Sequence, residues 1–283
     1  MDLGYWGFSH WPFQRHHAQT GVDVGAVYQE AQARLMFLID DHRRCGLLTG
    51  EPGTGKSRLF RQIARYAQRR GNLCVQIDMS GLDADGLIWH VAEQLLTDCN
   101  EQSSAHLCWS FVQKSLASLA ITKRPVVVLL EHLDPTSKDC LMAIRRLMNL
   151  ADSQRAKLTV LLTSRSKEAA SEIWDEIDLQ VELEPWNSAE TAHFIEQSLI
   201  ASGSTGHVFS EEALASIHEV TQGNPGEVIR ICDLVLLAAM SENRHQIDCA
   251  MVTDAVIELV PSRPHGLDRK STRLNSSHIP LSR

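Results

Sequence analysis

The segment Gly50-Glu-Pro-Gly-Thr-Gly-Lys56-Ser57 constrains this chain more than any other. It has the pattern G-x-x-x-x-G-K-[ST], with an apolar stretch before it and a helical pattern after it. In that context the glycines let backbone N–H groups turn inward around phosphate oxygens, while a lysine ammonium reaches the β and γ phosphates and a serine hydroxyl binds Mg²⁺. We therefore expect ATP and Mg²⁺ as cofactors, bound through Gly50, Glu51, Pro52, Gly53, Thr54, Gly55, Lys56, Ser57 and Arg58.

From about residue 26 to residue 185, apolar runs alternate with helical periodicity, which is typical of a parallel sheet covered by helices. The predicted strands are 45–49, 73–77, 126–130, 158–163 and 179–183, and the predicted helices between them are 26–42, 56–69, 87–96, 107–119 and 138–150. The most apolar run, 126–130, is predicted at the centre of the sheet because both of its faces must be buried.

After residue 185 the pattern is helical only, over 188–201, 210–221, 225–241 and 251–259. The fold class is therefore α/β: a three-layer P-loop NTPase core with a parallel sheet, followed by a small all-helical lid domain. We place the nucleotide-binding domain at residues 1–185 and the lid at residues 186–260.

The end of the sequence has a different origin. Residues 268–278 read DRKSTRLNSSH, which one frame of a common short-read sequencing adapter encodes. We expect 268–283 to be an assembly artefact and exclude it from the fold. This segment carries four basic residues and one acidic residue, so the formal net charge without it changes from −8 to −11. An acidic body disfavours a general nucleic-acid coat, although a local basic patch remains compatible with it.

Seven cysteines without a C-x-x-C pair indicate reduced thiols, and the scattered histidines, His16 and His17 included, lack metal-ligand spacing. The N-terminus has no signal-peptide pattern, and the longest aliphatic run is too short to span a bilayer. We therefore expect a cytoplasmic location, with no membrane segment in this chain.

The run 126–130 is followed by Glu131-His132-Leu133-Asp134, where a hydrolytic site of this kind normally has Asp-Glu. Glu131 can hold a metal-bound water, and a neutral His132 can orient the attacking water or accept its proton. Asp134 can take the place of the missing catalytic acid by acting through a bridging water. The alternative is a degenerate site that binds ATP but hydrolyses it slowly or not at all.

Polar residues also end the strand at 158–163. Thr163 is positioned to reach the γ-phosphate or its attacking water, and Arg165 either reaches a neighbour's nucleotide or is an ordinary solvated arginine. Near the N-terminus, Trp6, Trp11 and Phe13 either pack on the adenine or dock on the sheet.

The ordered set of motifs resembles the ExeA-type AAA+ ATPases, also called general secretion pathway protein A, and their relatives among transposition ATPases. The family's N-terminal motif is matched by Tyr5-Trp-Gly-Phe-Ser-His-Trp-Pro-Phe13, and two lid motifs are matched by Phe209-Ser-Glu-Glu-Ala-Leu214 and by the stretch from Gly223 to Leu237. The similarity spans about residues 5 to 259. One departure stands out: the family's sensor arginine follows the proline, and that slot is Gly226 here. Arg230, one helical turn later on the same face, either reaches back to replace it or pairs with the lid's own acidic residues.

The resemblance implies an oligomerising ATP switch in the assembly of a secretion or pilus-type machine, with protein partners of that machine and a place at the inner-membrane face through a further C-terminal segment. The weakened Glu131-His132 pair and Gly226 predict slow hydrolysis. Two alternatives stay open: a DNA-associated regulator similar to transposition ATPases, and a silent ATP-binding scaffold.

Overall fold

The computed structural model describes residues 3–13, 25–95, 103–134, 136–204 and 206–259. In these residues five parallel strands form one sheet, in the order β2-β3-β4-β1-β5. The strands are β1 (Cys45–Gly50), β2 (Leu73–Asp78), β3 (Val126–Glu131), β4 (Leu158–Ser164) and β5 (Leu179–Leu183). The helices are α1 (Leu3–Trp6), α2 (Ala26–Asp40), α3 (Lys56–Arg69), α4 (Ala84–Gln94), α5 (Ala105–Ile121), α6 (Lys138–Ser153), the 3-10 helix η1 (Lys167–Glu176), α7 (Ser188–Ala201), α8 (Glu211–Thr221), α9 (Pro225–Ser241) and α10 (Cys249–Leu259).

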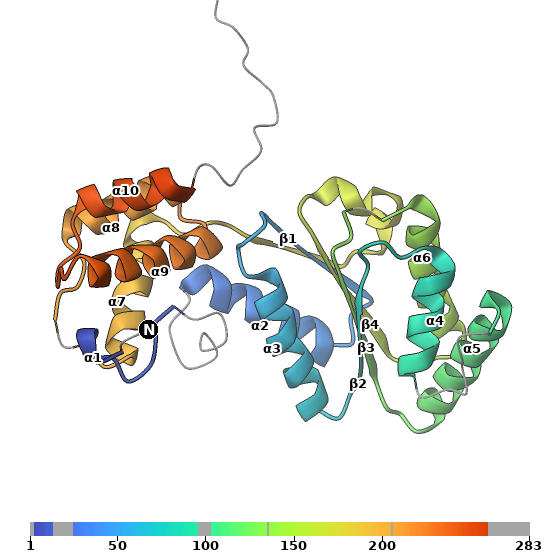
Figure 1. Cartoon of the computed structure of the whole chain (residues 1–283). Coiled ribbons are helices and arrows are strands. Elements are labelled where there is room, and N and C mark those ends of the chain that lie inside the picture. Colours follow the sequence, from blue (N-terminus) through green and yellow to red (C-terminus); the bar gives the residue numbers. More distant parts are fainter. Residues whose placement is uncertain (1–2, 14–24, 96–102, 135, 205, 260–283) are drawn as a thin grey trace, which may run out of the picture.

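Helices cover both faces of the sheet (Figure 1). Helices α2 and α3 pack on one face, where Val127 and Leu129 of β3 are buried with them. Helices α4, α5 and α6 pack on the other face, against Val126 and Val128 of the same strand. Alternate residues of one strand thus enter two separate apolar cores, which explains the uninterrupted apolar run in the sequence. The predicted three-layer α/β architecture is confirmed.

The central strand is β4, not β3, which corrects the prediction for residues 126–130. All seven residues of β4 are buried, including Thr159 and Thr163. The prediction failed because burial on both faces is shared by every interior strand, and β3 is an interior strand between β2 and β4.

Helices α7 to α10 form a separate helical region beside the sheet (Figure 1). The N-terminal segment packs here: Phe8, Trp11 and Phe13 belong to its apolar core, and Trp11 Nε1 donates a 2.7 Å hydrogen bond to Asp233. The prediction that these rings dock on the sheet is therefore wrong, because Trp11 and Phe13 are buried against the helical region instead. The domain boundaries stay a prediction, but this N-terminal segment is packed with residues beyond 186.

Two helix starts in this region are fixed by side-chain caps. Asn187, rather than Ser188, caps α7 through a capping box with Glu190. Ser210 accepts a hydrogen bond from the backbone N–H of Ala213 and caps α8.

No helix within the described ranges is long and apolar enough to cross a membrane. Residues 16 and 17 and the segment 268–283 lie outside those ranges.

Candidate nucleotide-binding site

The phosphate loop connects the end of β1 to the start of α3. Gly53 and Gly55 have φ values of 94° and 100°, a left-handed conformation that glycine adopts at little cost. Helix α3 begins at Lys56 and has no acidic residue in its first turn. The N-terminal end of this helix therefore offers free N–H groups and a favourable dipole to an anion.

The Lys56 side chain lies folded along this loop. Its Nζ donates hydrogen bonds to the carbonyl oxygens of Gly50 (2.6 Å) and Glu51 (2.9 Å). Burial lowers the pKa of Lys56, while the carboxylate of Asp134 acts in the opposite direction. Thr54 Oγ1 donates to the Glu51 carbonyl at 2.8 Å, which stabilises the turn from inside. Lys56 is thus a partly desolvated cation at the loop.

A cavity of about 450 Å³ opens in front of the loop. It collects nine of the residues predicted from the sequence: Pro52, Gly53, Gly55, Lys56, Ser57, Arg58, His132, Asp134 and Thr163. Arg165 also lines it, as does Arg61, which the sequence analysis did not single out. Residues from three separate chain segments therefore meet at the carboxyl edge of the sheet.

Five predicted residues do not line this cavity: Gly50, Glu51, Thr54, Glu131 and Arg230. The first three shape the loop from behind through the hydrogen bonds described above. Glu131 is the last residue of β3 and is partly buried behind the cavity wall. Arg230 lies 3.8 Å from the Glu227 carboxylate on its own helix. The structure therefore gives Arg230 an acidic partner within the lid.

His132 is held at the cavity by two neighbouring strands. Its φ of 60° is left-handed, and its backbone N–H donates to Thr163 Oγ1 at 3.1 Å. Its Nδ1 lies 3.0 Å from Oδ1 of Asp78, the last residue of β2. Burial acts to raise the pKa of Asp78, but hydrogen bonds from Ser80 and His132 outweigh it, so the pKa is lowered. With Nδ1 engaged by a carboxylate, Nε2 is the ring nitrogen left for the cavity.

Sequence reasoning missed Asp78. The parallel register places it directly opposite Glu131, so adjacency of β2 and β3 would have revealed it. Asp134 also has a structural role, because its Oδ1 accepts a 2.7 Å hydrogen bond from the backbone N–H of Arg165. This bond joins the segment after β3 to the segment after β4.

The turn before α9 touches the phosphate loop directly. Asn224 Nδ2 donates to the Pro52 carbonyl at 2.8 Å, and the Gly226 N–H donates to the Gly53 carbonyl at 3.1 Å. The Asn224 Oδ1 atom also accepts from Gly226 N at 3.1 Å and caps α9. A Cβ at position 226 would lie 3.1 Å from Gly53 Cα. A side chain in this slot, arginine included, would therefore press on the loop.

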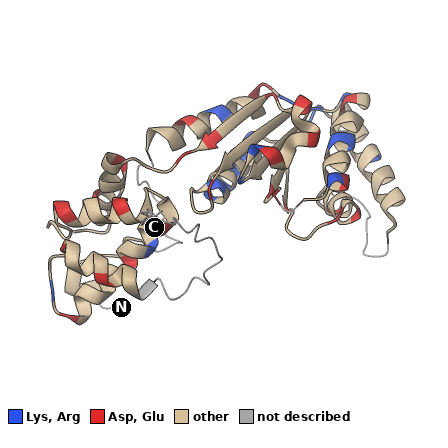
Figure 2. Ribbon diagram, turned by 90° about the horizontal axis from the view of Figure 1, so that it is seen from above, with Lys and Arg blue, Asp and Glu red and all other residues tan. Residues whose placement is uncertain are grey.

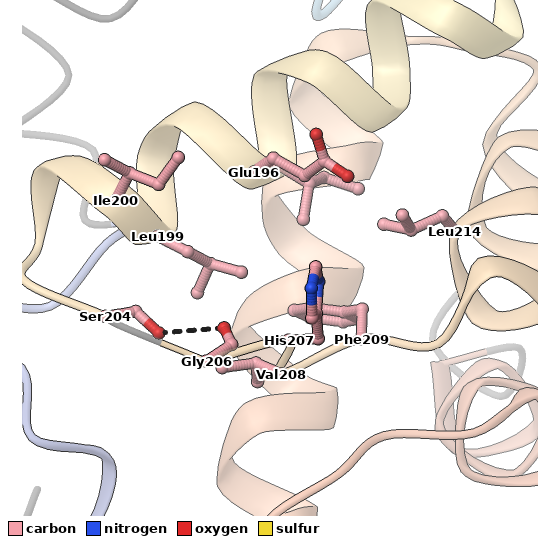
Figure 3. Close-up of a pocket in the computed structure, with 10 residues that line it drawn as sticks. Glu196, Leu199, Ile200, Ser204, Gly206, His207, Val208, Phe209 and Leu214 are labelled. Carbon is pink, nitrogen blue, oxygen red and sulfur yellow. Dashed lines mark hydrogen bonds between the residues drawn. The ribbon is translucent and has the colours of Figure 1, made fainter.

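A second cavity, of about 260 Å³, lies within the helical region (Figure 3). It is lined mainly by apolar side chains of α7, α8 and the segment between them, with Glu196 and His207 at its edge. It contains none of the residues predicted for nucleotide binding. We therefore assign the nucleotide site to the loop cavity.

The residues at the loop fit a triphosphate and a hard divalent cation. The left-handed glycines turn the loop backbone, and a Cβ at Gly53 would lie 2.3 Å from Oδ1 of Asn224, so only glycine allows the lid to approach the loop there. The Ser57 hydroxyl and the Asp134 carboxylate both line the cavity and are oxygen donors of the type that Mg²⁺ prefers. Glu131, the predicted metal residue, lies outside this lining.

Comparisons with known proteins find relatives of this chain. Residues 39–170, which include β1 to β4 and the phosphate loop, match the family profile described as an AAA domain. The chain is 24% identical over 276 residues to general secretion pathway protein A of Aeromonas hydrophila, an alignment that covers 94% of this chain and 50% of that protein. The chain therefore spans about half the length of this curated relative.

Solved structures share the fold. The chain resembles a Drosophila ORC structure bound to DNA, with a TM-score of 0.69, 17% identity and coverage of 89% of this chain and 67% of that one. Cdc6p from Pyrobaculum aerophilum gives a TM-score of 0.67 at 16% identity, covering 93% and 75%. The RuvB Holliday junction branch migration motor of Thermotoga maritima gives 0.55 at 16%, covering 83% and 70%. Residues 39–170 are thus similar to an AAA domain, and the chain as a whole is similar to general secretion pathway protein A.

Proposed function

We propose that the chain is a slow ATP-dependent switch that oligomerises during assembly of a secretion or pilus-type machine. The observation that carries the proposal is the contact between lid and phosphate loop, through Asn224 to Pro52 and Gly226 to Gly53. Any movement of the loop on binding a triphosphate must act on the start of α9. The secretion context rests on the similarity to general secretion pathway protein A.

In binding, the loop N–H groups and Lys56 hold the β and γ phosphates, and Ser57 with Asp134 provides oxygens for the cation. Mg²⁺, when bound, neutralises part of the phosphate charge. Lys56 must exchange its two carbonyl partners for phosphate oxygens. Because a charge-assisted bond to phosphate is stronger than a bond to a neutral carbonyl, this exchange favours the bound state.

In hydrolysis, a water oxygen attacks the γ-phosphorus, the bond to the β–γ bridging oxygen breaks, and ADP leaves. The proton of the water passes to His132 Nε2 and then to the released phosphate. Slow turnover is supported by two features: Glu131 does not line the cavity, and the lid supplies Gly226 where the family has an arginine.

We expect His132→Ala to lower phosphate release at saturating ATP by about 100-fold, the lower end of what a positioned base contributes. The affinity for ATP is expected to stay unchanged, because the ring is not part of the phosphate loop. Steady-state phosphate release and calorimetry measure the two quantities, and His90→Ala, which changes a partly buried histidine of α4 outside the cavity, is the matched control. A rate that stayed the same or rose would show that His132 takes no part in turnover.

The oligomeric switch predicts that phosphate release per subunit increases with protein concentration, because a neighbouring subunit completes the site. Release is measured across a dilution series of the full chain at saturating Mg-ATP, with Lys56→Ala subtracting contaminating activity. A rate per subunit that is constant over the series would contradict an oligomer-dependent site.

A second candidate function is a DNA-associated ATPase regulator. It is supported by structural neighbours whose descriptions include ORC bound to DNA and a Holliday junction branch migration motor. The acidic net charge of −8 weighs against it, unless basic residues are gathered on one surface.

A further inference from the structure

Helix α3 carries a row of arginines that the nucleotide site does not explain. Arg58, Arg61, Arg65 and Arg69 follow one another at intervals of three and four residues. At about 100° per residue, these four positions fall within an arc of about 80°. The buried residues of the same helix, Leu59, Phe60, Ile63, Ala64 and Ala67, lie on the opposite side. We call the four arginines the α3 stripe; Lys and Arg are blue in Figure 2.

The stripe is not neutralised within the part of the chain that the structure describes. None of its four members forms an ion pair with a described carboxylate, and Arg58 instead lies over the Tyr28 ring at 5.8 Å. Outside the stripe, seven described arginines have acidic partners, namely Arg34, Arg43, Arg44, Arg70, Arg145, Arg230 and Arg244. Arg124, Arg146, Arg155 and Arg165 have no ion pair within the described residues, but they are scattered over separate segments. In a chain with net charge −8, this concentration of unpaired positive charge on one helix face favours an anionic partner.

A bound ATP would lie near only two of the four arginines of the stripe. Arg58 and Arg61 line the nucleotide cavity, but Arg65 and Arg69 do not. At 1.5 Å per residue, these two lie about 6 Å and about 12 Å beyond Arg61 along the helix, and the whole stripe is about 16 Å long. Arg65 and Arg69 are exposed. The partner is therefore a regularly charged anion longer than a nucleotide.

The surroundings of the stripe favour a phosphate backbone over a protein. None of the large apolar side chains that are exposed in the described ranges lies on α3. Gln62 and Gln68 are the polar neighbours of the stripe on the same side of the helix. A protein interface needs a buried apolar centre, whereas contacts to phosphates need only cations and hydrogen-bond donors.

We propose that the α3 stripe binds the phosphate backbone of double-stranded DNA without reading its sequence. This inference assigns a surface to the second candidate function and does not depend on ATP hydrolysis. Binding through four phosphate contacts predicts a slope of about −3.6 for log affinity against log salt, which weakens binding about 150-fold between 50 and 200 mM salt.

The test uses the full chain and a fluorescein-labelled duplex of about 30 base pairs, followed by anisotropy across that salt range. We expect the double variant Arg65→Ala/Arg69→Ala to keep two contacts, with a slope of about −1.8 and a loss of about 12-fold over the same range. Arg34→Ala/Arg244→Ala removes the same charge from paired arginines elsewhere and is expected to keep the original slope. Residues 268–283 are common to all variants and cancel in the comparison.

Calorimetry with Mg-ATP is run on the same proteins and is expected to give equal affinities, since Arg65 and Arg69 lie outside the cavity. It reports failure of the nucleotide site separately from failure of the stripe. The proposal is overturned if no duplex binds at 50 mM salt, or if both double variants change the slope equally. It is also overturned if the stripe variant keeps its duplex slope but loses binding to phosphatidylserine vesicles or dissociates an oligomer.

Discussion

Replacement of Lys56 by alanine is expected to weaken Mg-ATP binding by at least about 30-fold. The ammonium is the cation nearest the loop, and removing one partner of a buried charged contact costs about 2–5 kcal/mol. Part of this loss comes from phosphate charge left without its counter-ion. Isothermal calorimetry on the folded full chain measures the affinity, with ADP as a second ligand to separate the β-phosphate contribution from the γ-phosphate contribution.

Lys114→Ala is the matched control, because Lys114 is an exposed lysine of α5 and does not line the cavity. Circular dichroism checks that the loss of the Lys56 bonds to Gly50 and Glu51 leaves the fold intact. Equal affinities for wild type and Lys56→Ala would remove the triphosphate pocket from the proposal, and with it the ATP switch.

The sequence was sufficient for the architecture and for the phosphate loop, because both depend on local patterns. The strand ranges follow from apolar runs, and the loop follows from eight consecutive residues between β1 and α3. The position of each strand in the sheet was not predictable in this way. Strands β3 and β4 both have two buried faces, and only their pairing partners show that β4 is central.

Two contacts at the site that sequence reasoning missed join distant segments. Asp78 reaches His132 across 54 residues, and Asn224 reaches Pro52 across 172 residues. Helical spacing allowed both readings of Arg230, and the structure shows the one in which it pairs with Glu227, three residues earlier on the same helix. Gly226 is not merely a lost arginine, since its N–H and its lack of a side chain both serve the contact with Gly53.

The turn that makes this contact depends on Gly223, and Gly223→Ala is expected to destabilise the protein by about 2–5 kcal/mol. Gly223 has a φ of 71°, and its carbonyl accepts a 2.9 Å hydrogen bond from the backbone N–H of Trp186. A Cβ here would lie 1.8 Å from the Trp186 carbonyl oxygen. The chain leaving the sheet and the turn before α9 would have to separate, which would also draw Asn224 away from Pro52.

Alanine variants of two other glycines separate the two contributions to this loss of stability, backbone strain and steric overlap. Gly71 has a φ of 84° but open space around its Cβ position, so Gly71→Ala measures backbone strain alone, about 1–2 kcal/mol. Gly206 has open space and no left-handed φ, so its alanine variant is expected to stay within about 0.5 kcal/mol of wild type. Urea unfolding followed by tryptophan fluorescence gives the three free energies. If Gly223→Ala cost no more than Gly71→Ala, close packing against Trp186 would not be what holds the turn to the phosphate loop, and the mechanical link between loop and lid would have to be sought in Asn224 alone.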